Sequence, residues 1–130
     1  SKWFILLVLA VVWGSSFILM KKGEVWAGVW PNDPEQKERP LLIVSNNHRN
    51  SAKNLEDIVV VKLTSLYRED GSKKITNPSE DIIETFKSET IIRCASIYSI
   101  EKKNLKRRLA VLGPNIMNKV NECLKIVLNL

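Results

Sequence analysis

The stretch Glu38-Arg39-Pro40-Leu41-Leu42-Ile43-Val44-Ser45 decides the fold of this chain. Pro40 opens a continuous apolar run that ends at Ser45, and an apolar run bounded by polar residues is typical of a strand buried on both faces. Arg39 therefore lies at the mouth of a buried strand, directly after a polar loop. A guanidinium in such a position is well placed to meet an anion.

A second apolar run, Ile58–Leu63, leads into Thr64 and Ser65. It predicts another buried strand, one that ends in hydroxyl groups. A fixed cation at one strand end and a hydroxyl at another, without an obvious metal site, favour chemistry on a phosphodiester. The only histidine is His48, in a polar segment, so a ribonuclease mechanism with two histidines and a histidine-rich metal site are both excluded.

Length and composition predict one small domain with a basic surface. The chain has 130 residues and a formal net charge of +6, which favours a polyanionic partner or an acidic protein. The 2 cysteines, Cys94 and Cys123, are too few for a disulfide framework and lack metal-type spacing. We expect both to be reduced in apolar surroundings, as in a cytosolic domain.

The N-terminal segment differs from the rest of the chain. Residues 3–20 carry no charge, and lysines flank them on both sides. About 18 such residues span a bilayer core as a helix, so this segment predicts a membrane anchor for a cytoplasmic domain. The alternative is a buried element of a soluble core. Trp13–Gly23 resembles the first membrane helix of EamA-type drug/metabolite transporters, but nothing after Gly23 supplies the further helices of that family.

We therefore divide the chain into an apolar N-terminal helix, residues 1–20, and a second domain, residues 21–130. The first part is an anchor, a fusion or an extended start. The second part is predicted to be mainly β. Its expected elements are strands at Glu24–Trp30, Leu41–Ser45, Ile58–Leu66 and Thr90–Ile100, polar loops at Pro31–Glu38, Asn46–Asp57 and Tyr67–Lys74, and a less regular apolar segment at Ile82–Phe86.

The C-terminal end is predicted to be a helix. Gly113 precedes Pro114, and proline suits the first helical position because its missing N–H costs nothing there. Apolar residues then recur at helical spacing and form one face for packing on the sheet. These residues are Ile116, Val120, Cys123, Leu124, Val127 and Leu128.

Four segments together resemble the PemK/MazF family of toxin endoribonucleases, over about residues 20–130. The resemblance implies an α+β domain with a small SH3-like β-barrel and a C-terminal helix. It also implies a homodimer that binds single-stranded RNA along its groove. The segments are Lys22–Trp26, Arg39–Asn46, Val59–Ser65 and Ile92–Ile100, and Leu112, Met117, Val120 and Leu124 follow them at the expected positions.

The resemblance further implies RNA cleavage without a metal or other cofactor, in which a 2′-hydroxyl attacks the neighbouring phosphate. Arg39 takes the place of the family's catalytic arginine, and Thr64 that of its catalytic threonine. Arg39 stays charged near neutrality, so it suits stabilisation of the pentacoordinate phosphate better than the role of a base. The alternatives are a surface salt bridge of Arg39 with Glu35 or Glu38, and a locally bonded hydroxyl at Thr64.

Further RNA contacts are expected from polar, aromatic and basic side chains near these motifs and in the cluster after Ile100. Tryptophans offer stacking surfaces for unpaired bases, and lysines and arginines contact phosphates. Packing inside the domain and solvated surface charge are the competing interpretations. The residues expected to contact RNA are Glu24, Trp26, Gln36, Ser65, Lys102, Lys103 and Arg107.

The loop Pro31–Arg39 departs from the family, because it is shorter and contains no glycine. This loop forms a wall of the RNA groove, so the family's sequence preference is not carried over. An acidic antitoxin whose extended segment occupies the groove is the expected protein partner. The alternative function is a non-catalytic binding module on the same barrel, such as a gyrase poison or a membrane-tethered module. Retention of both Arg39 and Thr64 favours the nuclease.

Overall fold

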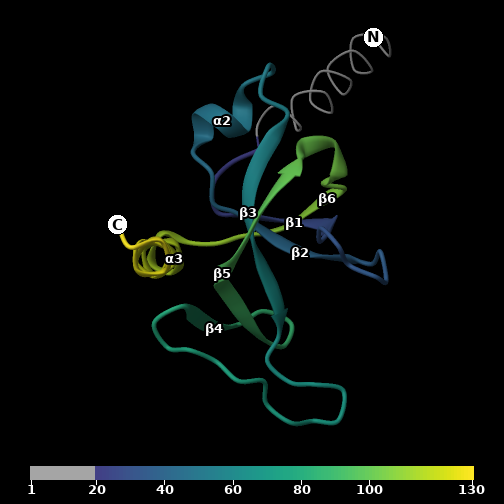
Figure 1. Ribbon diagram of the computed structural model, residues 1–130, viewed down its shortest axis with the longest axis vertical. Helices are drawn as coiled ribbons and strands as arrows, with labels where there is room; N and C mark the ends of the chain where they lie inside the picture. Colours follow the sequence, from purple (N-terminus) through teal and green to yellow (C-terminus); the bar gives the residue numbers. More distant parts are fainter. Residues whose placement is uncertain (1–19) are drawn as a thin grey trace, which may run out of the picture.

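The computed structural model describes residues 20–130 (Figure 1). The predicted apolar helix, on which the expected membrane association depends, lies outside the described residues except for Met20. Of the transporter-like stretch Trp13–Gly23, only residues 20–23 are described. At this end Met20 is 1% exposed and packs in the core of the following domain. None of the helices within residues 20–130 is long and apolar enough to cross a bilayer.

This part of the chain is mainly β with a C-terminal helix, as predicted. A 6-stranded sheet has the order β4-β5-β3-β2-β1-β6, and all neighbouring strands are antiparallel. The helix α3 lies at one side of the sheet (Figure 1). The elements are β1 (Glu24–Val29), β2 (Glu38–Ile43), α2 (Asn47–Ser51), β3 (Asp57–Ser65), β4 (Asp81–Thr85), β5 (Glu89–Glu101), η1 (Lys102–Asn104), β6 (Arg107–Val111) and α3 (Pro114–Leu128).

The strand β2 begins earlier than predicted, so that Arg39 and Pro40 belong to it. Pro40 lies opposite Ala27 of β1, and the paired register with β3 starts at Leu41. A strand end that is paired on only one side tolerates a residue without an N–H. The catalytic candidate Arg39 is therefore held in a strand rather than in the preceding loop.

The strand β5 confirms the strand predicted at Thr90–Ile100, and it lies between β4 and β3 in the sheet. Its pairing with β3 shifts register between Val61 and Lys62. An irregularity of this kind bends the strands and increases their twist. Together with a second shift between β1 and β6, it curves the sheet.

Two apolar clusters fill the two sides of the curved sheet. Successive strand residues point to opposite faces, so β2 supplies Leu42 to one cluster and Leu41 and Ile43 to the other. The cluster with Leu42 also contains Val120 and Cys123 of α3. This arrangement explains why the apolar runs are continuous rather than alternating.

The helix α3 follows the prediction except at its end. Gly113 is the N-cap residue and Pro114 the first helical residue. Leu128 was expected on the packing face but is 54% exposed. Cys94 and Cys123 are free and buried, as predicted. Burial raises the pKa of the Cys94 thiol to about 12, and its neighbour Cys123 adds to this rise.

Three elements, α2, η1 and β6, have no counterpart in the sequence prediction. The polar segment after β2 contains the short helix α2, and Asn46 caps it by accepting a hydrogen bond from Arg49 N at 2.8 Å. The basic stretch after β5 continues into the edge strand β6, in which Leu109 is 47% exposed and Val111 63%. A strand with apolar side chains on its outer surface shows no alternating pattern, so it escaped prediction.

We expect Leu42→Ala to lower the free energy of unfolding by about 2–5 kcal/mol, because it opens a cavity in the fully buried cluster against α3. Urea unfolding followed by circular dichroism measures the change. Ile75→Ala is the matched control, since Ile75 is 84% exposed, and it should change stability by less than about 0.5 kcal/mol. Equal losses in both variants would contradict this assignment of the core.

Candidate active site

The pairing of β2 and β3 brings Arg39 and Thr64 together. Leu41 lies opposite Lys62 in the antiparallel ladder, and the same register places Arg39 opposite Thr64. Residues two apart on a strand share a face, so Arg39 lies on the face of Leu41 and Thr64 on the face of Lys62. Because Leu41 and Lys62 lie opposite each other, both site side chains are on the same side of the sheet. Both line a cavity of about 540 Å³, together with Trp30, Ser65, Tyr67, Arg68, Glu69, Lys74, Ser88 and Thr90 among others.

Two carboxylates from the loop between β1 and β2 hold Arg39. Its Nε donates to Oδ2 of Asp33 at 3.0 Å, and its Nη2 donates to Oε2 of Glu35 at 3.0 Å. Asp33 is 6% exposed, whereas the side chain of Glu35 is 64% exposed. The buried carboxylate therefore orients the guanidinium, while the exposed one is open to displacement by a phosphate. Glu38, the other expected partner, pairs with Arg107 instead.

Hydrogen bonds within the same loop are made to Asp33. Oδ1 of Asp33 accepts a hydrogen bond from Glu35 N at 3.0 Å, and its carbonyl oxygen accepts one from Gln36 Nε2 at 2.7 Å. Burial by itself would raise the pKa of the Asp33 carboxyl. The hydrogen bonds from Arg39 and from backbone N–H groups outweigh burial and hold this pKa below its usual value. Asp33 is therefore ionised at neutral pH and paired with Arg39.

Left-handed backbone conformations make this short loop possible without glycine. Asn32 has a φ of 63° and Gln36 a φ of 50°. Asparagine adopts this region readily, but glutamine does so only when its surroundings impose the conformation. The hydrogen bonds of Gln36 to Asp33 provide this constraint.

The indole of Trp30 supports two cations at the site. The guanidinium carbon of Arg39 lies 4.4 Å from the ring centroid, and Lys62 Nζ lies 3.9 Å from it. Cations at these distances are attracted by the ring quadrupole. Trp30 was expected either to stack on bases or to pack inside the domain; in this structure its ring contacts the two basic side chains. Its buried Nε1 makes no hydrogen bond within residues 20–130.

The hydroxyl of Thr64 has a basic partner that the sequence did not indicate. Lys74 Nζ donates a hydrogen bond to Thr64 Oγ1 at 2.8 Å. Lys74 belongs to the loop after β3, and its backbone N–H bonds Leu66 O at 2.8 Å, which fixes it beside the end of that strand. The loop itself forms the predicted hairpin-like turn, with Tyr67 paired to Lys73.

Basic side chains from three strands and a loop converge around this hydroxyl. Arg93 of β5 lies opposite Lys62 and is paired with Asp81 at 3.2 Å. Burial, followed by the charges of Arg93 and Arg39, lowers the pKa of Lys62. Burial, followed by the charges of Arg93 and Lys62 among others, likewise lowers the pKa of Lys74. Like charges held this closely make a strongly positive site, suited to an anion.

This arrangement can bind a phosphodiester and stabilise extra negative charge on it. The guanidinium of Arg39 offers N–H groups in a fixed plane that matches phosphate oxygens. The Thr64 hydroxyl offers one further donor from the opposite strand. Among residues 20–130, no group of three or more histidine, cysteine, aspartate or glutamate side chains is arranged to hold a metal ion.

Two of the expected RNA contacts lie at or beside the cavity. Ser65 lines the cavity itself. Gln36 lines a neighbouring cavity of about 460 Å³ that also has Trp30 in its wall. The ring of Trp30 is thus common to both cavities.

Glu24 and Trp26 serve the interior of the domain. Glu24 is 4% exposed; its Oε2 accepts from Arg108 at 2.9 Å and its Oε1 from Lys21 N at 2.7 Å. Trp26 is 6% exposed and packs in the cluster of Leu41. Neither residue lines the cavity of Arg39 and Thr64.

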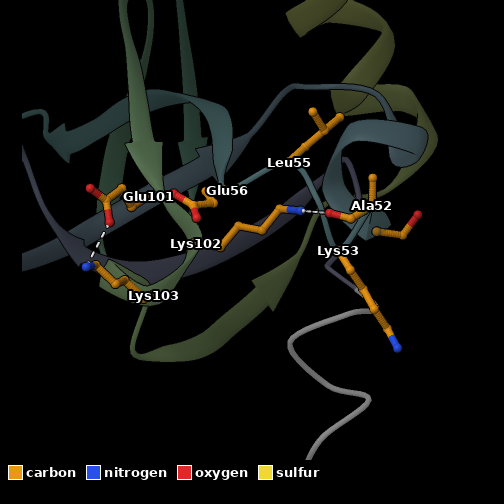
Figure 2. Close-up of a pocket in the computed structure, with 8 residues that line it drawn as sticks. Ala52, Lys53, Leu55, Glu56, Glu101, Lys102 and Lys103 are labelled. Atoms are coloured by element: carbon orange, nitrogen blue, oxygen red, sulfur yellow. Dashed lines mark hydrogen bonds and ion pairs between the residues drawn. The ribbon is translucent and has the colours of Figure 1, made fainter.

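The expected basic contacts lie outside the cavity of Arg39 and Thr64. Lys102 points toward Ala52, and its Nζ donates to the carbonyls of Arg49 and Ala52 at 2.9 Å each (Figure 2). It thus satisfies carbonyls at the C-terminal end of α2. Lys103 forms an exposed ion pair with Glu101 at 3.1 Å (Figure 2). Arg107 forms its own exposed ion pair across β2 and β6.

Four residues of the site were missed by the sequence analysis: Asp33, Lys62, Lys74 and Arg93. For Asp33 a signal existed, because an acidic residue in a short loop bounded by prolines lies close to the arginine that follows. Lys62 interrupts an apolar strand two residues before Thr64, which was a second signal. The roles of Lys74 and Arg93 depend on loop closure and strand register, which residue type alone does not predict.

The fold and the cavity define a small, basic β protein with a cavity lined by Arg39, Arg68 and Lys74. The family model for PemK-like, MazF-like toxins of type II toxin–antitoxin systems matches residues 21–128. The chain belongs to this family, and the match covers the sheet, the cavity and α3.

Solved structures agree with this membership. An endoribonuclease in complex with its cognate antitoxin, from a mycobacterial species, superposes with a TM-score of 0.67 at 27% identity, covering 85% of this chain and 96% of its own. An endoribonuclease from a mycobacterial species gives 0.65 at 27% identity, covering 86% and 93%. The Deinococcus radiodurans MazE–MazF structure gives 0.65 at 13% identity, covering 86% and 98%, which supports the fold alone. Among curated proteins no match was found.

We expect the ammonium groups of Lys62 and Lys74 to titrate below the ordinary lysine value of 10.5, because the site buries them beside other cations. NMR of lysine side-chain nuclei as a function of pH measures both. Lys103 is the internal control, since its hydrogen bond with Glu101 raises its pKa. Titration of all three lysines at the same pH would contradict the electrostatics described above.

Proposed function

We propose that this protein is the toxin of a type II toxin–antitoxin system and an endoribonuclease that cleaves single-stranded RNA at the cavity of Arg39 and Thr64. The single observation that carries the proposal is that Arg39 of β2 and Thr64 of β3 line one basic cavity. Membership of the toxin family and the mycobacterial endoribonucleases at 27% identity support the activity.

In the proposed reaction the RNA supplies its own nucleophile. The 2′-oxygen attacks the adjacent phosphorus, a P–O2′ bond forms and the P–O5′ bond breaks. The 2′-hydroxyl loses its proton to solvent, and the leaving 5′-oxygen takes up a proton from solvent. The products are a 2′,3′-cyclic phosphate and a 5′-hydroxyl, and no oxidant, reductant or metal is required.

The two residues act on the charge of the transition state. The pentacoordinate phosphate carries more negative charge than the substrate, so donors that are already oriented lower the barrier. Arg39 is held in place by Asp33 and stacks against Trp30, so its guanidinium needs little reorganisation. We infer that the phosphate displaces the exposed Glu35 and takes its place on Arg39.

An antitoxin and a second copy of the chain complete the proposal. One mycobacterial relative is an endoribonuclease in complex with its cognate antitoxin. By analogy we propose an acidic antitoxin here, because a segment rich in carboxylates would neutralise the same cations that bind RNA. We also propose that the working form is a homodimer with an SH3-like barrel in each subunit, as the family resemblance implies.

We expect residues 20–130 to cleave single-stranded RNA in the presence of EDTA, and Arg39→Ala to lower kcat by roughly 100- to 1,000-fold because it removes a preoriented charged donor. Thr64→Val should reduce kcat less, since a neutral donor is lost. Cleavage of a labelled oligonucleotide and analysis of the product ends measure both effects. Arg107→Ala is the matched control, an arginine in an exposed ion pair outside the cavity.

Equal activity in wild type and Arg39→Ala would refute the site assignment. No cleavage by the wild-type protein of any RNA would refute the proposed function and leave a non-catalytic toxin on the same fold.

We expect Asp33→Asn to lower kcat by roughly 10- to 100-fold without unfolding the domain, because a buried hydrogen bond between charged groups orients Arg39. Glu35→Gln is the matched variant, since it removes the exposed partner of the same guanidinium. A surface ion pair contributes little, so its effect should stay within about fivefold. The comparison uses kcat from the same oligonucleotide assay, and a larger effect of Glu35→Gln would reverse the roles given to the two carboxylates.

A further inference from the structure

Lys74 is a basic side chain at the site whose position the backbone fixes. It lies in the loop between β3 and β4, and its N–H donates to Leu66 O at 2.8 Å. Within the loop, Arg68 N bonds Ser72 O at 2.8 Å and Gly71 N bonds Arg68 O at 2.9 Å. The loop is thus closed at its base by backbone hydrogen bonds. These backbone hydrogen bonds therefore hold Lys74 in the wall of the cavity.

The hydrogen bond of Lys74 decides the direction of the Thr64 hydroxyl. An ammonium group has only donors, so Thr64 Oγ1 must be the acceptor in their 2.8 Å contact. The hydroxyl proton then cannot point at Lys74 and is free to turn into the cavity. A hydroxyl that accepts from a cation is also polarised, which makes it a better donor.

We propose that Lys74 is a positioning residue of the cleavage reaction: its ammonium group fixes and polarises the Thr64 hydroxyl so that this hydroxyl donates its proton in a hydrogen bond to a non-bridging phosphate oxygen. The proposal rests on the proposed function and deepens it, because it assigns Thr64 the role of a donor rather than an acceptor for the attacking 2′-hydroxyl. No covalent bond to Lys74 forms or breaks.

The charges around Lys74 make this role dependent on pH. Arg39 on β2, Lys62 on β3, Arg93 on β5 and Arg68 of its own loop all face it, and Glu69 and Tyr67 line the same cavity. Burial and the cations together lower the pKa of Lys74. Its ammonium form, which polarises Thr64, is therefore lost at a lower pH than in an ordinary lysine.

The test compares kcat for wild type, Lys74→Met and Lys74→Arg on one oligonucleotide. We expect Lys74→Met to lower kcat by about 10- to 100-fold, the range of a charge-assisted hydrogen bond, with KM changed by less than about threefold. Lys74→Arg should recover most of the activity. Lys73→Met is the matched control, because Lys73 is the neighbouring lysine and its side chain faces Tyr67.

A double-mutant cycle shows whether Lys74 acts through Thr64. In the Thr64→Val background, Lys74→Met should lower kcat by less than about threefold further, since the hydroxyl that it positions is gone. The pH profile gives an independent measure. The alkaline fall in kcat should move to higher pH in Lys74→Arg than in wild type, because arginine keeps its charge.

Each outcome bears on a different statement. The inference would be overturned if Lys74→Met and Lys73→Met lowered kcat equally, or if Lys74→Met lowered kcat equally with and without the Thr64 hydroxyl. Cleavage by the wild type would still uphold the proposed function in either case. Absence of cleavage by the wild type would overturn both. Thermal melting of each variant identifies loss of the fold, and recovery in Lys74→Arg separates lost positioning from lost stability.

Discussion

The antiparallel register between β2 and β3 is the constraint on which the site depends. Leu41 lies opposite Lys62 at the end of this ladder, and Arg39 and Thr64 lie two residues beyond that pair on their strands. Because side chains alternate along a strand, a slip of one residue would send Arg39 to the other face of the sheet and Leu42 out of its cluster. The burial of Leu41, Leu42 and Ile43 in two separate clusters therefore fixes the chemistry as well as the fold.

The site brings several positive charges together, and acidic partners neutralise only some of them. Asp33 is paired with Arg39 and Asp81 with Arg93, whereas Lys74 donates a hydrogen bond to the uncharged hydroxyl of Thr64. Repulsion among cations costs stability in the free protein. That cost falls when a phosphate enters, so part of the attraction for an anion is built into the folded state before binding.

The sequence predicted those features that arise from local pattern. The strands at Glu24–Trp30 and Thr90–Ile100 and the helix after Pro114 follow from apolar periodicity and a proline signal, and all three were confirmed. The edge strand β6 was missed because its side chains are exposed on the outer surface. The partner Lys74 was missed because a loop's closure depends on hydrogen bonds rather than on composition. The assigned roles of Arg39 and Thr64 stay predictions.

The loop before Arg39, built without glycine and with Asn32 and Gln36 in left-handed conformations, has a consequence for how a substrate is chosen. A loop that is already ordered gives up little conformational entropy when it meets a ligand. If this loop contacts the proposed RNA substrate, binding depends on the fit of the RNA to a loop of fixed shape. An RNA that does not fit is not accommodated by a movement of the loop. The shortness of the loop thus favours narrow selectivity over adaptability.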